Sequence, residues 1–285
     1  MLERARARGL ELERKPTGQP VVTGFYQLTS LGDTHQTWQG LLDGKSGVRA
    51  FNVNNFRTNI AAPVEFDPND HFDKKEQKSM AIITAMTIVG ARNAGEMAQL
   101  LGKDKRLLPF LNKKRVSMCI SSGIGPTHNL IDIFSTIHSQ NGEGESDNEL
   151  DEEAMQKVKA EGMRQGSRKV NPFSGLRSFP EQPNAQAALA LGVSGWPINS
   201  PEACATGLSA IAEGARLIRD GYADMVFAGG AEEVLRQHGE VGIASFASMK
   251  ALSTKNEEPE KASRPFDKDR DGFVLASGIG VVVLE

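Results

Sequence analysis

The stretch that decides the fold runs from Ser200 to Gly230 and reads SPEACATGLSAIAEGARLIRDGYADMVFAGG. Small or apolar residues recur in it at helical intervals, at Cys204, Leu208, Ile211, Ala215 and Ile218. This spacing predicts a helix with one buried face. Asp220-Gly221 would end that helix, and the apolar run from Met225 predicts a short buried strand. The stretch is therefore typical of the helix-then-strand unit of an α/β protein.

Cys204 falls in the first turn of the predicted helix, on the side expected to face the core. The unpaired N–H groups and positive end of a helix favour a thiolate at this position. The small neighbours Ala205 and Gly207 leave room for a substrate. Free cysteine is also among the most buried residue types in proteins. From the spacing alone, a nucleophile and an inert core thiol therefore both stay open.

The composition excludes several classes of protein. The chain has 285 residues, 39% of them hydrophobic, with a net charge of -3, so nothing draws it as a whole to nucleic acids or anionic membranes. Two cysteines argue against a disulfide framework and favour a reducing compartment, by default the cytoplasm. No apolar run approaches the ~20 residues of a membrane span. Residues 1–20 predict a disordered leader, whose arginines leave import into the mitochondrial matrix or another organelle open.

Predicted strands and helices alternate along the chain, which indicates an α/β sheet covered by helices. A strand opens at Val21, and Asp33 or Thr34 would cap the helix that follows it. One long helix is predicted from Lys75 to Leu101, and a buried strand leads from Arg115 into a glycine turn. Cys119 lies in the middle of that strand with no activating neighbour, so it is predicted to be a core residue.

Two charged segments and the histidines complete the survey. Seven carboxylates between Glu143 and Glu153 predict a solvated acidic surface insertion at about 141–169. Asp267, Asp269 and Asp271 imitate a calcium loop, but its twelfth position is Gly278 rather than glutamate. The histidines are scattered, and only His238 follows Cys204. Because no metal-ligand spacing appears, no metal site is predicted.

Three segments together resemble the condensing β-ketoacyl-acyl carrier protein synthases of fatty-acid synthesis. They are residues 200–233, which contain SPEACATG, residues 245–256, SFASMKALSTKN, and residues 262–285, which contain RPFDKDRDGFV. The opening VVTGFYQLTSLG and WQGLLDGKSGV fit the same family. The resemblance covers roughly residues 21–285 and is interrupted by the acidic insertion.

The resemblance implies a thiolase-like fold, built from two similar α/β halves and usually dimeric. Residues 21–285 would form the first, N-terminal ketosynthase half, a mixed sheet covered by helices. The second half is absent from this sequence. The full-length protein is therefore expected to be a homodimer, and the truncated chain is not expected to complete the reaction.

The resemblance also implies a β-ketoacyl-[acyl-carrier-protein] synthase activity. Cys204 would accept an acyl group from acyl carrier protein and pass it to the carbanion formed by decarboxylation of malonyl-carrier. Phe246 and Phe273 would line the acyl pocket. Lys75, Lys78 and Lys250 would contact the acidic carrier protein. No cofactor is implied beyond the phosphopantetheine on which acyl carrier protein holds the substrates.

The sequence departs from the family pattern in ways that keep other hypotheses open. Glu202 stands where the family has threonine or serine, and on a strand its carboxylate would share a face with the thiol and hold it protonated. The two family histidines that drive decarboxylation belong to the second half. A non-catalytic ketosynthase-like partner subunit of a condensing heterodimer is therefore the alternative hypothesis. A thiol hydrolase is a third, which needs a histidine partner for Cys204.

Overall fold

The computed structural model describes residues 18–53, 56–138, 164, 166–236 and 239–285. The predicted leader falls mainly outside these residues, as does most of the predicted acidic insertion. His238 also lies outside them. In the described part of the chain, no helix has both the length and the apolar character that a membrane crossing requires.

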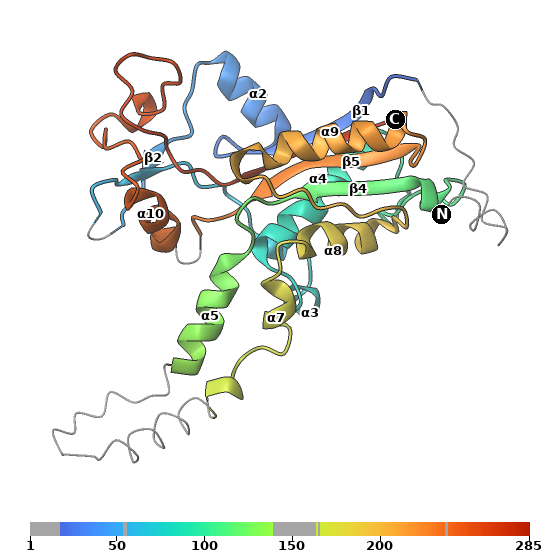
Figure 1. Cartoon of the computed structure of the whole chain (residues 1–285), viewed down its shortest axis with the longest axis horizontal. Coiled ribbons are helices and arrows are strands. Elements are labelled where there is room, and N and C mark those ends of the chain that lie inside the picture. Colours follow the sequence, from blue (N-terminus) through green and yellow to red (C-terminus); the bar gives the residue numbers. More distant parts are fainter. Residues whose placement is uncertain (1–17, 54–55, 139–163, 165, 237–238) are drawn as a thin grey trace.

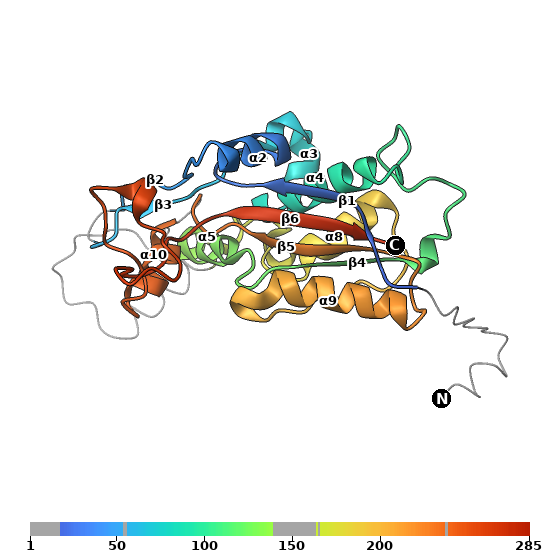
Figure 2. The same cartoon turned by 90° about the horizontal axis from the view of Figure 1, so that it is seen from above.

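A mixed sheet of four strands forms the centre of the fold, in the order β1-β6-β5-β4 (Figure 2). The strands are β1 (Val22–Leu28), β4 (Val116–Ser121), β5 (Met225–Glu232) and β6 (Gly278–Leu284). Strands β4 and β5 are parallel, whereas β6 runs antiparallel to both of its neighbours, β5 and β1. The carboxyl ends of β4 and β5 therefore lie at one edge of the sheet, and both strands contribute residues there.

Helices cover both faces of the sheet, as the sequence predicts (Figures 1 and 2). Helix α9 (Thr206–Arg219) packs on one face, against β5 and β4, while α4 (Ile82–Met97) and α8 (Gln182–Leu191) pack on the other. Successive side chains of β5 point to opposite faces of the sheet. Phe227 belongs to the core under α4 and α8, whereas Val226 and Ala228 belong to the core under α9.

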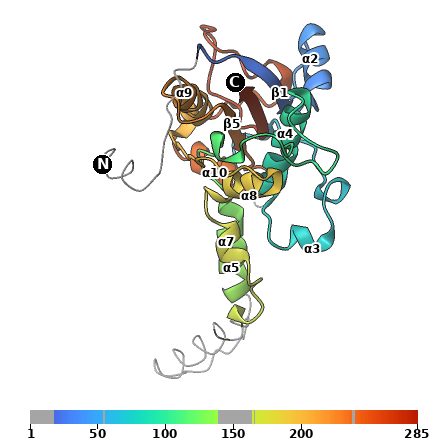
Figure 3. The ribbon, with the colours of Figure 1, turned by 90° about the vertical axis from the view of Figure 1, so that its right-hand side faces the viewer.

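Shorter elements surround these layers. Helices α5 (Thr127–His138) and α7 (Ser174–Arg177) lie side by side and project away from the sheet (Figures 1 and 3). The others are β2 (Arg49–Ala50), β3 (Ile60–Ala61), η1 (Pro68–Asp70), η2 (Lys113–Arg115), η3 (Ala203–Ala205), α10 (Gly239–Ala247) and η4 (Pro259–Lys261). Helix α10 lies beyond the carboxyl ends of β4 and β5 (Figure 1).

The helix boundaries confirm one prediction and correct another. Asp33 caps α2 (Thr34–Leu42) through a capping box with Gln36. The single helix predicted from Lys75 to Leu101 is instead two helices, α3 (Lys74–Gln77) and α4. Ala81 is extended and lacks a side-chain cap, while Met80 and Ala81 are buried in the core. Tertiary burial therefore sets this break, which no local sequence signal marks.

The predicted buried face of α9 is also partly wrong. Cys204 precedes the helix and is exposed, and Leu208 is 72% exposed. The face against the sheet is instead formed by Ala210, Gly214, Leu217 and Ile218, with Ile211 and Ala215 partly buried beside it. A Cβ atom at Gly214 would lie 3.0 Å from Val226 Cγ1 and 3.2 Å from Ala228 Cβ. The small residues let the helix approach β5 closely, and this contact outweighs the hydrophobicity of Leu208.

Candidate active site

Cys204 lies in a strained turn, η3, directly before α9, and its side chain is exposed. Ala203 has φ +49°, a left-handed conformation that costs an ordinary residue about 1 kcal/mol or more. Buried Thr206 holds this turn, since its hydroxyl accepts a hydrogen bond from the N–H of Glu202 at 2.8 Å and donates to the carbonyl of Ala203 at 2.7 Å. The turn presents the thiol at the start of the helix, outside its buried face.

The expectation that Glu202 shares a strand face with the thiol is wrong. Glu202 has φ -132° and ψ 46° and stands at the start of η3, so the alternation of side chains along a strand does not apply. Its carboxylate accepts a hydrogen bond from Ser209 Oγ at 3.1 Å. This contact ties Glu202 to the first turn of α9.

Cys204 lines a cavity of about 580 Å³. The cavity lies at the carboxyl ends of β4 and β5, where the N-terminus of α9 meets them, and this is the edge at which open α/β sheets bind ligands. Phe246 from α10 and Phe273 line the same cavity, with their rings edge to face and their centroids 5.4 Å apart. The structure thus brings together three residues that the sequence analysis singled out over a span of 70 positions.

Glycine allows the backbone segments around the thiol to approach one another. A Cβ atom at Gly123 would lie 2.7 Å from the carbonyl oxygen of Ala203. One at Gly230 would lie 3.0 Å from Cα of Gly207. Real Cβ atoms rarely approach that closely, so glycine at these positions lets the Cys204 turn rest on the ends of β4 and β5.

Glu232, at the end of β5, organises the loop on the other side of the cavity. Its carboxylate accepts hydrogen bonds from Ser122 Oγ at 2.8 Å and from the N–H groups of Gly123 and Ile124 at 3.0 Å each. Burial raises the pKa of Glu232 despite these hydrogen bonds, which act in the opposite direction. No motif in the sequence singled out this residue; the signal that could have found it is an acidic side chain two residues after Gly229-Gly230, at a strand end.

The raised pKa of Glu232 predicts how the stability of the fold depends on pH. The folded chain holds the Glu232 proton more tightly than the unfolded chain, so this stabilisation is complete below the ordinary glutamate pKa of about 4.3 and is lost as pH rises through the raised value. We expect the Glu232→Gln variant to lack this pH-dependent loss of stability. Urea unfolding midpoints measured from about pH 4 to about pH 8 test this expectation. Glu257→Gln, at an exposed position, should keep the wild-type slope. A Glu232→Gln slope equal to that of the wild type would contradict the prediction.

The three predicted carrier-binding lysines do not form a single cluster. Lys75 lies in α3 and Lys78 directly after it, and both are exposed. Lys250 is exposed in the turn after α10, where it has φ +56°. Helices α3 and α10 lie apart in Figures 1 and 2. The lysines therefore occupy two separate places on the surface.

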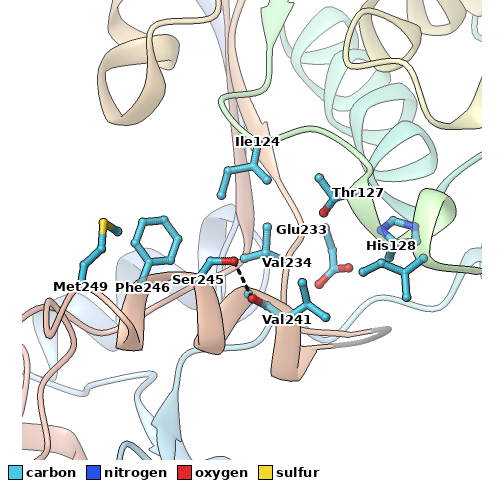
Figure 4. Close-up of a pocket in the computed structure, with 11 residues that line it drawn as sticks. Ile124, Thr127, His128, Glu233, Val234, Val241, Ser245, Phe246 and Met249 are labelled. Atoms are coloured by element: carbon cyan, nitrogen blue, oxygen red, sulfur yellow. Dashed lines mark hydrogen bonds between the residues drawn. The ribbon is translucent and has the colours of Figure 1, made fainter.

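A second cavity, of about 290 Å³, adjoins the first (Figure 4). Ile124 and Phe246 line both cavities. His128 from α5 and Glu233, the residue after β5, also line the second cavity, and both are buried. In the sequence, His128 is one of several scattered histidines, and no motif singles out Glu233. Only the tertiary structure brings these two residues to a cavity beside the thiol site.

Two other residues have structural roles. Cys119 is fully buried in β4, which confirms the prediction of a core residue. Burial raises the pKa of this thiol to about 12, and the negative charge of Glu213 adds to the effect. Asp271 accepts hydrogen bonds from Ser253 Oγ at 2.6 Å and from the N–H of Thr254 at 2.9 Å, so it holds a loop together. Within the described ranges, no cluster of three or more acidic, histidine or cysteine side chains could hold a metal ion.

Comparison with known proteins places this chain in a family. The family model described as "Beta-ketoacyl synthase, N-terminal domain" matches residues 20–285. The chain is 35% identical over 270 residues to the 3-oxoacyl-[acyl-carrier-protein] synthase 2 of Vibrio cholerae, an alignment that covers 93% of this chain and 57% of that protein. The chain thus spans somewhat more than half the length of this curated relative.

Solved structures show the same fold. A β-ketoacyl synthase from Burkholderia phymatum is similar with a TM-score of 0.73 and 24% identity, over 94% of this chain and 59% of that one. A type II PKS ketosynthase, solved in complex with its acyl-carrier protein and bound to the hexaketide, is similar with a TM-score of 0.71 and 24% identity. That match covers 95% of this chain and 58% of the other. The chain therefore belongs to the β-ketoacyl synthase family and corresponds to its N-terminal domain, with a thiolase-like ketosynthase fold.

Proposed function

We infer that the chain carries the acyl-transfer step of a 3-oxoacyl-[acyl-carrier-protein] synthase, with Cys204 as the nucleophile. The observation that supports this inference is an exposed thiol in a strained turn at a helix N-terminus, on a cavity of about 580 Å³. A cavity of this size can take a fatty acyl chain, and ligand pockets in proteins commonly fall in the range of about 300–1,000 Å³.

The step is an exchange of thioesters. The Cys204 sulfur attacks the carbonyl carbon of an acyl group held on the phosphopantetheine thiol of acyl carrier protein. A new carbon–sulfur bond forms, the old one breaks, and the carrier leaves as a thiol with the proton that Cys204 gives up. Ala205, at the N-cap of α9, makes no side-chain capping bond, and the positive end of the helix dipole can polarise the carbonyl oxygen.

The condensation itself needs a second step, in which malonyl-carrier loses carbon dioxide and its carbanion attacks the acyl group on Cys204. That step requires donors that stabilise the developing enolate. No histidine is among the described residues that line the Cys204 cavity. We therefore assign acyl transfer, and not decarboxylation, to the described residues that line this cavity.

The other predicted site residues keep their proposed roles. Phe246 and Phe273 border the acyl chain, since both line the cavity of Cys204. Lys75, Lys78 and Lys250 contact the acidic acyl carrier protein at two separate places. A carrier partner is consistent with the similar ketosynthase that was solved with its acyl-carrier protein. Assembly into a homodimer stays a prediction.

Peptide mapping after incubation with an acyl-carrier-protein thioester tests this function. We expect one acyl adduct on the peptide that contains Cys204 and none on the peptide that contains Cys119, which is fully buried. Hydroxylamine should remove the adduct, because a thioester is labile to it. Absence of an adduct on Cys204 would contradict the proposal and favour the non-catalytic partner subunit.

A further inference from the structure

The second cavity contains a buried carboxylate with an unused oxygen. Glu233 is only 2% exposed and lines this cavity of about 290 Å³. Figure 4 shows its side chain near His128, on the far side of Val234 from Phe246. Most of the other lining residues are apolar, among them Ile124, Ile131, Val234, Val241, Phe246 and Met249.

The two oxygens of Glu233 differ in their hydrogen bonds. Oε1 accepts from the N–H groups of Leu235 at 3.2 Å and Arg236 at 3.0 Å, and from Ser277 Oγ at 3.0 Å. Oε2 is buried and has no hydrogen-bond partner. Oε1 alone therefore holds the turn that follows β5, and the structural role of the side chain does not account for Oε2.

An unsatisfied buried acceptor destabilises a folded protein, and a charged one does so more than a neutral one. Glu233 lines the second cavity, so a ligand that brings a donor to this side chain can satisfy Oε2. The second cavity shares Ile124 and Phe246 with the cavity of Cys204. A chain attached to the Cys204 sulfur would have to pass between these two residues to enter the second cavity.

We propose that the second cavity accepts the distal part of an acyl chain that carries a hydroxyl group, and that Glu233 Oε2 accepts the hydrogen bond of that hydroxyl. The proposal rests on the acyl-transfer function inferred above and names its substrate class, a hydroxyacyl thioester. A hydroxyl brings one donor to one unused acceptor. An ammonium group would bring three donors into a largely apolar lining, so it fits less well.

The test measures binding with ligands that cannot react with Cys204. The ligands are pantetheine amides of one acyl chain length. At a given distal carbon, three forms are compared, which carry a hydroxyl, a ketone or no substituent. The comparison is repeated for each distal carbon in turn. We expect calorimetry on the full chain to give, at one position, a dissociation constant for the hydroxyl form about 10-fold or more below that of the ketone form. A hydrogen bond to a carboxylate requires a donor, and the ketone has none.

Glu233→Gln tests the residue itself. Its amide can keep the hydrogen bonds of Oε1 while presenting an NH₂ donor where Oε2 was, and this donor serves a ketone as well as a hydroxyl. We expect the preference for hydroxyl over ketone to fall to about 3-fold or less. Glu257→Gln, an exposed substitution of the same type, should keep the wild-type preference. Circular dichroism melting checks that both variants are folded.

The outcomes separate this proposal from the proposed function. No hydroxyl preference at any position, or a preference that survives in Glu233→Gln, would overturn it. A structure of the complex with the unsubstituted amide would also overturn it if a water molecule donates to Oε2 there and calorimetry shows that the hydroxyl form binds no more tightly than the unsubstituted form. Because the amides do not react, a chain that failed to load acyl groups onto Cys204 would still report the preference.

Discussion

Replacing Cys204 with alanine is expected to reduce acyl transfer from an acyl-carrier-protein thioester by at least about 10³-fold. The alanine side chain cannot form the acyl-enzyme bond, and the described lining of the cavity contains no other cysteine. The strained turn should survive, since its hydrogen bonds involve Glu202, Ala203 and Thr206 rather than the thiol. The measurement is the rate of acyl adduct formation, followed by mass spectrometry.

Two control variants define what this result means. Cys119→Ala removes the other thiol, which is buried in β4, and should load acyl groups at a rate within about 3-fold of the wild type. Cys204→Ser keeps a weak nucleophile and should form, at most, an ester that hydroxylamine removes more slowly. Unchanged loading in Cys204→Ala would move the nucleophile to another residue and end the assignment.

Replacing Asn184 with alanine is expected to lower the free energy of unfolding by about 2–5 kcal/mol. Asn184 is fully buried in α8, and its amide joins two backbone segments. Its Oδ1 accepts from the N–H of Ile120 in β4 at 2.9 Å, and its Nδ2 donates to the carbonyl of Ile198 at 3.1 Å. Alanine leaves both of these backbone groups without that partner, and a typical domain has only about 5–15 kcal/mol of stability.

Chemical denaturation measures this loss. Gln186→Ala is the matched control, because Gln186 lies on the same helix and is only partly buried. It donates to the Ser79 carbonyl at 3.2 Å and to Gln182 Oε1 at 3.4 Å. The control substitution should cost about 1 kcal/mol or less. Ile198 belongs to the segment that leads into the Cys204 turn, so Asn184→Ala should also slow acyl loading. Equal denaturation midpoints for the two variants would contradict the role given to Asn184.

Local patterns in the sequence were sufficient for several of the elements and for the family. Asp33 predicts the start of α2 because the capping interaction involves residues three positions apart. The apolar runs predict β4 and β5 because strands buried on both faces need apolar residues throughout. The SPEACATG and RPFDKDRDGFV segments point to the β-ketoacyl synthase family because several neighbouring positions match at once.

The candidate site was only partly predictable. The resemblance singled out Cys204, Phe246 and Phe273, and the structure places all three on one cavity. It gave no reason to select Glu232, Glu233 or His128. Their positions depend on which side of the sheet each strand end and helix faces, and residues far apart in the sequence decide that.

By itself, the sequence determined an α/β chain of the β-ketoacyl synthase family with Cys204 at the start of a helix. Only the tertiary structure decided which side of α9 is buried, since the close approach of Ala210 and Gly214 to β5 outweighs the apolar spacing. Packing also decided that Cys204 lies exposed in a strained turn, and that Glu233, which lines a cavity, has one buried oxygen without a hydrogen-bond partner. The physical reason is that periodicity reports which residues can be buried, whereas contacts between distant segments fix which of them are.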